Sequence, residues 1–112
     1  MLRDRGQVVF EETEDGLIVH VGGEIDHHSA VSARRQIDER ITLSYASKVY
    51  LELSGVEFMD SSGLGLIMGR YSLSKQSGKE FAVLDPSFAV VKMMNLCGME
   101  RMIRILKHKK SS

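Results

Sequence analysis

The sequence predicts an α/β fold in which strands and helices alternate along the chain after an opening β-hairpin. Short β-rich runs alternate with stretches whose apolar residues recur every three or four positions, and glycine or proline separates most of them. The predicted order is β-β-α-β-α-β-α, followed by a short apolar segment. Such alternation favours parallel pairing with right-handed crossovers. The chain has 112 residues, the size of one domain, so we expect a single domain over residues 1–112.

The first two strands are predicted on either side of the pair Asp15-Gly16, a strong hairpin turn signal. One β-rich run covers residues 7–13 and the other covers residues 17–21. The pair Gly22-Gly23 is expected to end the second strand. These features predict an antiparallel hairpin at one edge of the sheet.

Apolar spacing predicts the first helix after Asp26, a residue type that commonly caps a helix N-terminus. The stripe consists of Ala30, Ala33, Ile37 and Ile41. The next strand is predicted over residues 48–53, where buried and exposed residue types alternate. Residues 56–59 are expected to form a short irregular connection in which Met59 is exposed.

A second helix is predicted to open at Asp60-Ser61-Ser62-Gly63 and to end near Gly78. Its expected core face is formed by Leu64, Ile67, Met68 and Tyr71. A strand over residues 81–84 follows, and Asp85-Pro86-Ser87 then starts a third helix that ends at Gly98. Cys97 is expected to be a small buried side chain. The apolar residues from 102 to 106 fit either a strand or a helix.

Composition excludes several classes of protein. The net charge is zero and the basic cluster lies only near the C-terminus, which argues against a nucleic-acid partner. No run of about 18 apolar residues exists, so we expect no membrane contact and no signal peptide. Cys97 is the only cysteine, so an intramolecular disulfide is excluded and a zinc site is not expected. A single thiol fits the reducing cytoplasm. We expect no metal and no cofactor.

The segment around Ser61 is the candidate site, because partners of open α/β sheets meet the carboxyl ends of strands. Asp60 or Ser61 can cap the helix, and a cap alone is the usual role of such residues. Three glycines within this one helix, Gly63, Gly65 and Gly69, each cost up to ~1 kcal/mol relative to alanine. Such a helix is expected to need close backbone approach, to the sheet or to a partner. A phosphate on Ser61 would meet free N–H groups and the positive end of the helix dipole.

Three stretches carry a resemblance to a known family. FMDSSGLGLIMGRY, from Phe58 to Tyr71, resembles the signature of anti-sigma factor antagonists, the bacterial branch of STAS domains. GEIDHHSA, from Gly23 to Ala30, resembles the second family motif. DPSFAVVKMMNLCG resembles the family's third helix, with a departure at its Asp-Pro-Ser start. The resemblance implies the STAS fold, a mixed four- to five-stranded sheet with three to four helices mainly on one face.

The resemblance also implies a function without catalysis. Proteins of this kind bind an anti-sigma factor that is itself a serine kinase, and so release the sigma factor. The kinase then phosphorylates the serine after the motif's aspartate, Ser61 here, and a metal-dependent serine phosphatase reverses this. Asp26, Asp60 and Ser62 would surround the phosphorylation site. The implied partner-binding residues are Met59, Asp60, Ser61, Ser62, Gly63, Gly65 and His27.

Other functions remain as alternatives. Ser61, Asp60, His27 and His28 suggest a hydrolase, but the nucleophile pattern G-x-S-x-G is absent. The glycine-rich stretch GLGLIMGR suggests nucleotide binding, but it lacks the Gly-Lys-Ser/Thr ending of a P-loop. The chain could also be a STAS module of another signalling or transport assembly.

Overall fold

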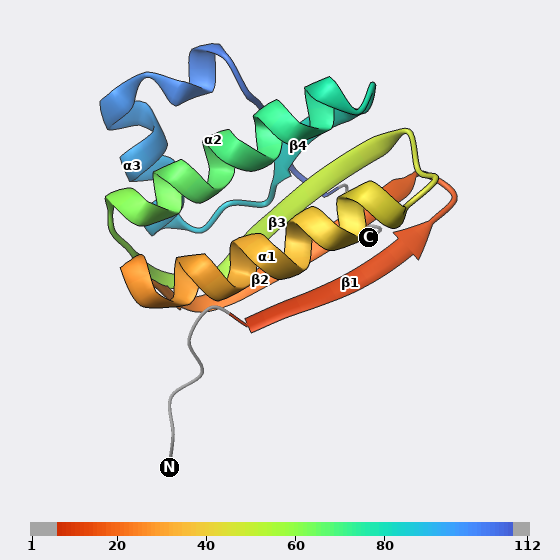
Figure 1. The fold of residues 1–112 in the computed structure, drawn as a ribbon. Coiled ribbons are helices and arrows are strands. Elements are labelled where there is room, and N and C mark those ends of the chain that lie inside the picture. Colours follow the sequence, from red (N-terminus) through yellow and green to blue (C-terminus); the bar gives the residue numbers. More distant parts are fainter. Residues whose placement is uncertain (1–6, 109–112) are drawn as a thin grey trace.

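The computed structural model describes residues 7–108, which form one mixed sheet with helices packed on it (Figure 1). The five strands lie in the sheet in the same order as in the sequence. The first pair is antiparallel and the other three pairs are parallel. The strands are β1 (Gln7–Thr13), β2 (Gly16–Ile25), β3 (Lys48–Met59), β4 (Glu80–Leu84) and β5 (Arg104–Leu106). The predicted α/β class and the N-terminal hairpin are confirmed.

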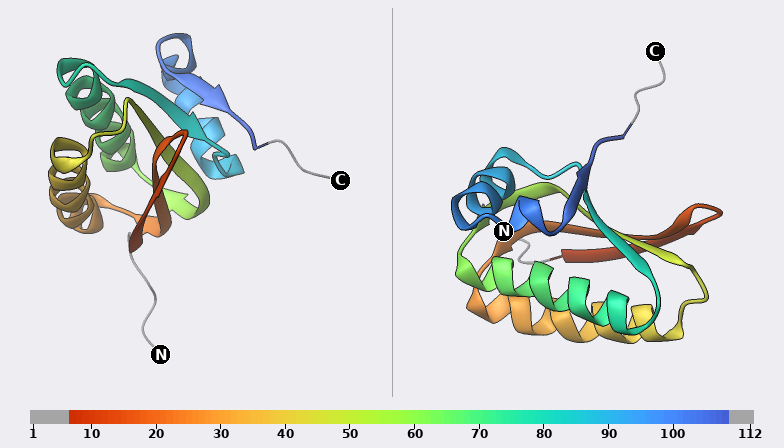
Figure 2. Two further views of the ribbon diagram at one scale, coloured as in Figure 1. Left: turned by 90° about the vertical axis from the view of Figure 1, so that its right-hand side faces the viewer. Right: turned by 90° about the horizontal axis from the view of Figure 1, so that it is seen from above.

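The helices connect the parallel strands. They are α1 (His27–Leu43), α2 (Ser61–Gln76) and α3 (Phe88–Cys97), with a short 3-10 turn, η1 (Met99–Arg101), before β5. Figure 2 shows α1 and α2 side by side on one face of the sheet, while α3 lies apart from them. The Ser87 N–H, at the start of α3, donates to the Leu53 carbonyl and so attaches α3 beside the second half of β3. None of the helices between residues 7 and 108 has the length and apolar character needed to cross a bilayer.

The core forms where alternate residues of the strands meet the inner stripes of the helices. Val49, Leu51 and Leu53 of β3 are buried, as the alternation predicts. The predicted stripe of α1 is also buried at Ala33, Ile37 and Ile41. These side chains belong to one cluster that also includes residues of β2, α2 and α3. The cluster holds the two parallel helices at fixed positions on the sheet.

The inner face of α2 differs from the prediction. Ile67 is buried as expected, but Leu64, Met68 and Tyr71 are only partly buried. The other buried residues of the helix are Gly63, Leu66, Arg70 and Ser74. The reason is that α2 packs against both the sheet and α1, so its buried surface is wider than one stripe.

Strands β2 and β3 are longer than predicted. Gly22-Gly23 does not end β2, and residues 56–59 are not an irregular connection, because the two strands stay paired up to Ile25 and Met59. The glycines instead sit at register shifts inside the pair, where a Cβ on Gly55 would lie 3.4 Å from Gly22 Cα. Glycine serves close approach of two backbones here.

The C-terminal elements decide three further expectations. Gly98 ends α3 in a left-handed conformation with φ of 75°, as predicted for a helix end. The apolar residues after it form η1 and then strand β5. Cys97 is exposed, so the prediction that it is buried is wrong. Cys97 follows Val90 and Met94 on the same stripe of α3, but it is the last residue of the helix and lies at its exposed end, beside the cap at Gly98.

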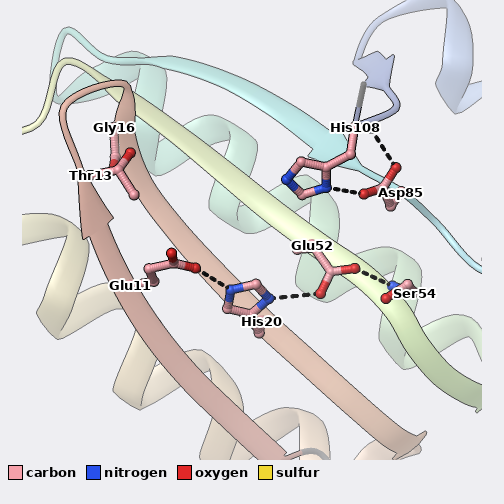
Figure 3. A network of polar contacts seen from close by, with 8 residues as sticks. All are labelled: Glu11, Thr13, Gly16, His20, Glu52, Ser54, Asp85 and His108. Carbon is pink, nitrogen blue, oxygen red and sulfur yellow. Dashed lines mark hydrogen bonds and ion pairs between the residues drawn. The ribbon is translucent and has the colours of Figure 1, made fainter. Parts of the chain in front are cut away.

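A polar network lies on the sheet face opposite α1 and α2 (Figure 3). His20 of β2 contacts Glu52 of β3 through Nδ1 at 2.8 Å and Glu11 of β1 through Nε2 at 2.9 Å. The second carboxylate oxygen of Glu52 accepts the Ser54 N–H at 2.8 Å. Burial opposes protonation of His20, but the bonds to Glu52 and Glu11 outweigh it and raise the pKa of the imidazole above 6.5.

This network predicts a pH-dependent stability. Because the pKa of His20 is raised in the folded state, its stabilisation is fully present below pH 6.5 and is lost as the pH rises through the folded value. We expect His20→Gln to lower the urea midpoint at about pH 6 and to have less effect at about pH 9. His28→Gln, at an exposed histidine on α1, is the control. A His20→Gln effect that is equal at both pH values would contradict this prediction.

Candidate functional site

The candidate site lies where β2 and β3 pass into α1 and α2. Ile25 and Met59 are paired at the ends of these strands, and the Asp60 N–H donates to the Ile25 carbonyl at 3.2 Å. The two helices therefore begin next to each other. This contact brings the predicted residues Asp26 and Asp60, one from each loop, to the same edge of the sheet.

Each aspartate caps its helix through one carboxylate oxygen. Asp26 Oδ1 accepts the Ser29 N–H at 2.9 Å, and Ser29 Oγ accepts the Asp26 N–H at 3.1 Å, so the two residues form a capping box. Asp60 Oδ1 accepts the Ser62 N–H at 2.8 Å. Both predictions of a cap are confirmed, and at the second helix the cap is Asp60 rather than Ser61.

Ser61 is the first residue of α2 and is exposed. Its hydroxyl makes no hydrogen bond within residues 7–108, whereas the neighbouring Ser62 is half-buried. The fold therefore does not use the Ser61 hydroxyl to hold the helix start. The hydroxyl is free to react with a group that arrives from solvent, beside helix N–H groups and the positive end of the α2 dipole.

Two of the predicted partner-binding residues lie inside the protein. Met59 is only 4% exposed, so the expectation that it lies in an exposed connection is wrong. The reason is that strand β3 extends as far as Met59, and its geometry directs the Met59 side chain into the core. Gly63 is buried against it, and a Cβ at position 63 would collide with Cγ and Sδ of Met59. Met59 and Gly63 therefore pack against each other in the core and hold the start of α2 in place.

Two further predicted contact residues, His27 and Gly65, face outwards. His27 and Gly65 are exposed, and a Cβ at Gly65 would meet no other atom within 4 Å. Gly69, one turn further along α2, is equally open. Of the three glycines in this helix, only Gly63 serves close packing within the protein. Within the part of the chain that the structure describes, no close contact requires glycine at positions 65 and 69.

The hydrolase alternative predicts a histidine that is hydrogen-bonded to the Ser61 hydroxyl. The side chains of His27 and His28 are exposed and make no hydrogen bond to Ser61 in the described part of the chain. Between residues 7 and 108 there is also no group of three or more His, Cys, Asp or Glu side chains placed to hold a metal ion.

Sequence reasoning missed a groove between α1 and α2 beside Ser61. Its α1 side is lined by His27, Ala30, Val31 and Arg34, and its α2 side by Ser62, Gly65 and Leu66. The α1 residues are spaced by three and four, as expected for one face of a helix. That spacing was visible in the sequence, but which helix lies opposite it was not.

Comparison with known proteins agrees with this fold. The STAS domain family model matches residues 7–111. An anti-sigma F factor antagonist of Paenibacillus polymyxa is 39% identical over 99 residues, which cover 88% of this chain and 85% of that protein. The solved structure of the anti-sigma factor antagonist SpoIIAA in its unphosphorylated form has a TM-score of 0.76 and 24% identity, with 93% and 90% of the two chains covered.

SpoIIAA of Bacillus, a cell fate determinant, has also been solved in its phosphorylated form, and that structure matches with a TM-score of 0.71 and 24% identity. The aligned region covers 93% of this chain and 93% of the SpoIIAA chain. These likenesses confirm a mixed sheet that begins with an antiparallel hairpin. The family match spans nearly the whole chain, and the relative from Paenibacillus exceeds one-third identity over most of both sequences. The chain therefore belongs to the STAS domain family, in its branch of anti-sigma factor antagonists.

Proposed function

We propose that this chain is an anti-sigma factor antagonist whose partner-binding surface is switched off by a phosphate on Ser61. In the unphosphorylated form it binds an anti-sigma factor that is a serine kinase, and the sigma factor is released. The kinase modifies Ser61, and a serine phosphatase of the metal-dependent type removes the phosphate. The protein itself acts by binding, without catalysis, and its proposed location is the cytoplasm.

One observation carries this proposal: the Ser61 hydroxyl is exposed and has no hydrogen bond to the described residues, while Asp60 already caps the helix. A serine that served only as a cap would bond to the helix N–H groups itself. The relatives support the partner, because they include anti-sigma factor antagonists. The phosphorylated SpoIIAA structure supports modification within the same fold.

The residues divide by role under this proposal. Asp60, Ser61, Ser62, Gly65 and His27 form the outward surface that the partner contacts. Met59 and Gly63 hold that surface in place from within the core. Asp26 lies at the same edge of the sheet and forms part of the negative surroundings of the phosphate.

Mass spectrometry tests the assignment directly. After incubation with the anti-sigma kinase of the same organism and ATP, we expect one phosphate per chain, located on Ser61 by fragmentation. Ser62→Ala is the matched control and should still be modified, because Ser62 is half-buried at the same helix start. Ser61→Ala should remain unmodified. A phosphate found on Ser62 in the wild-type chain would overturn the assignment.

A further inference from the structure

The groove between α1 and α2 has an unbalanced positive charge. Arg34 lies on its α1 side and makes no hydrogen bond or ion pair with any residue between 7 and 108. The groove is open to solvent and has a cavity volume of about 280 Å³, enough for side chains of a partner to enter. Among residues 7–108, no carboxylate lines it.

The residues just beyond the groove do not neutralise Arg34. One turn further along, Arg70 of α2 is 5% exposed, and its Nε lies 2.8 Å from Asp38 Oδ1 of α1. This is an ion pair without hydrogen-bond geometry, because Nε and Nη1 of Arg70 have no hydrogen-bond partner in the described chain. Burial lowers the pKa of Arg70, Asp38 opposes this, and the nearby charge of Arg34 lowers it further. Asp38 therefore pairs with Arg70, and Arg34 has no carboxylate partner among residues 7–108.

The surroundings of the groove are also basic on the α1 side. A neighbouring hollow on the outer side of α1 is lined by His27, His28, Ser29, Val31, Ser32 and Arg35, again without a carboxylate. At the end of the groove where α1 and α2 begin, here called its mouth, Asp26 and Asp60 precede the lining residues His27 and Ser62 in the chain. Their Oδ1 atoms accept backbone N–H groups of the helix starts. An anionic segment of a partner would thus meet positive charge along α1 and the open backbone at Gly65.

We propose that this groove receives an acidic segment of the anti-sigma partner, with an aspartate or glutamate side chain bound by Arg34 and its backbone close to Gly65. This inference rests on the proposed function and adds the chemistry of recognition. It also explains why phosphorylation of Ser61 would weaken binding rather than strengthen it. Ser62 lines the groove and Ser61 precedes it, so a phosphate on Ser61 stands at the mouth and repels the acidic segment. The phosphate also competes for the positive charge of α1.

Charge variants test the proposal in a binding titration with the unphosphorylated chain and the anti-sigma kinase of the same organism. Arg34→Glu should weaken binding at least about thirtyfold and Arg34→Gln about tenfold, as for loss of a close charge pair. Arg101→Glu, at an exposed arginine of η1, is the matched control and should leave the affinity unchanged. A compensating Asp→Arg or Glu→Arg change on the kinase should restore binding to Arg34→Glu.

Variants that change the shape of the groove give a second, independent test of the proposal. Gly65→Gln and Gly69→Gln both add a side chain into open space on α2, so both should raise the melting temperature by roughly 3–8 °C. Only Gly65→Gln fills the groove, so only it should weaken binding to the kinase. Equal binding by both variants would overturn the proposal. A difference in binding could not come from stability, since the two variants are expected to be equally stable.

The outcomes separate this inference from the function on which it rests. If the wild-type chain binds the kinase and Ser61→Glu does not, while Arg34→Glu binds as well as the wild type, the groove proposal is wrong and the switch stands. If the wild-type chain does not bind the kinase, both are wrong. Binding of ATP alone to the wild-type chain, lost in Arg34→Glu, would overturn the acidic segment in favour of a nucleotide phosphate.

Discussion

Ser61→Glu is expected to reduce the affinity for the anti-sigma kinase about a hundredfold. Two unit charges about 6 Å apart interact with ~3 kcal/mol at an effective dielectric constant of 20, and 1.4 kcal/mol is a factor of ten. A phosphoserine carries about 1.5 to 2 negative charges, so phosphorylation itself should cost about a thousandfold or more. The measurement is a titration of each form, wild type, phosphorylated and Ser61→Glu, against the kinase.

The control for this prediction is Ser61→Gln, which has the size of glutamate without its charge. We expect it to bind nearly as well as the wild type. The fold should be unaffected by phosphorylation and by Ser61→Glu, because a negative group at the first position of α2 is favourable to the helix dipole. Ser61→Gln should also fold normally, because position 61 is exposed. If Ser61→Gln binds as poorly as Ser61→Glu, steric exclusion rather than charge is the cause and the electrostatic account is wrong.

The second large effect is expected from Gly63→Val, which should lower the free energy of unfolding by roughly 1–3 kcal/mol, as overpacking does in a full core. The added side chain would collide with Met59, and Met59 has little room to move because it is 4% exposed. Urea denaturation measures this loss. Partner binding should weaken as well, because the start of α2 carries Ser61.

A double-mutant cycle with Met59→Ala tests the cause of that loss. Removal of the Met59 side chain costs stability on its own, but it also makes room for valine. The two changes should therefore be coupled by roughly 0.5–3 kcal/mol, in the direction that makes the double variant more stable than additivity predicts. Gly65→Val is the matched control, since that position is open. Strict additivity of Gly63→Val and Met59→Ala would show that the collision is not the cause.

The sequence was sufficient to predict the elements whose signals are local. The order of strands and helices, the caps at Asp26 and Asp60 and the left-handed Gly98 all depend on a few adjacent residues. The exposed Ser61 at a helix start followed from the same local signals. These features could be predicted because they need no knowledge of what packs against them.

Features that depend on pairing between distant segments could not be predicted. Gly22-Gly23 and Gly55 are typical of strand ends, yet here they allow two strands to approach at a shifted register. That shift interrupts the alternation after Leu53, so the inward direction of Met59 was hidden. The groove around Arg34 depends on how α1 and α2 lie together, and the bonds of His20 depend on the register of three strands.

The hydrogen bond from the Asp60 N–H to the Ile25 carbonyl has a consequence for the kinetics of association. This bond joins the β2–α1 and β3–α2 connections into one binding surface, and each connection is also held by its own helix cap. A visiting protein thus meets a preorganised platform and loses little conformational entropy in ordering it. Encounter should then be limited by diffusion and orientation rather than by rearrangement, so differences in affinity among variants should appear mainly in residence time.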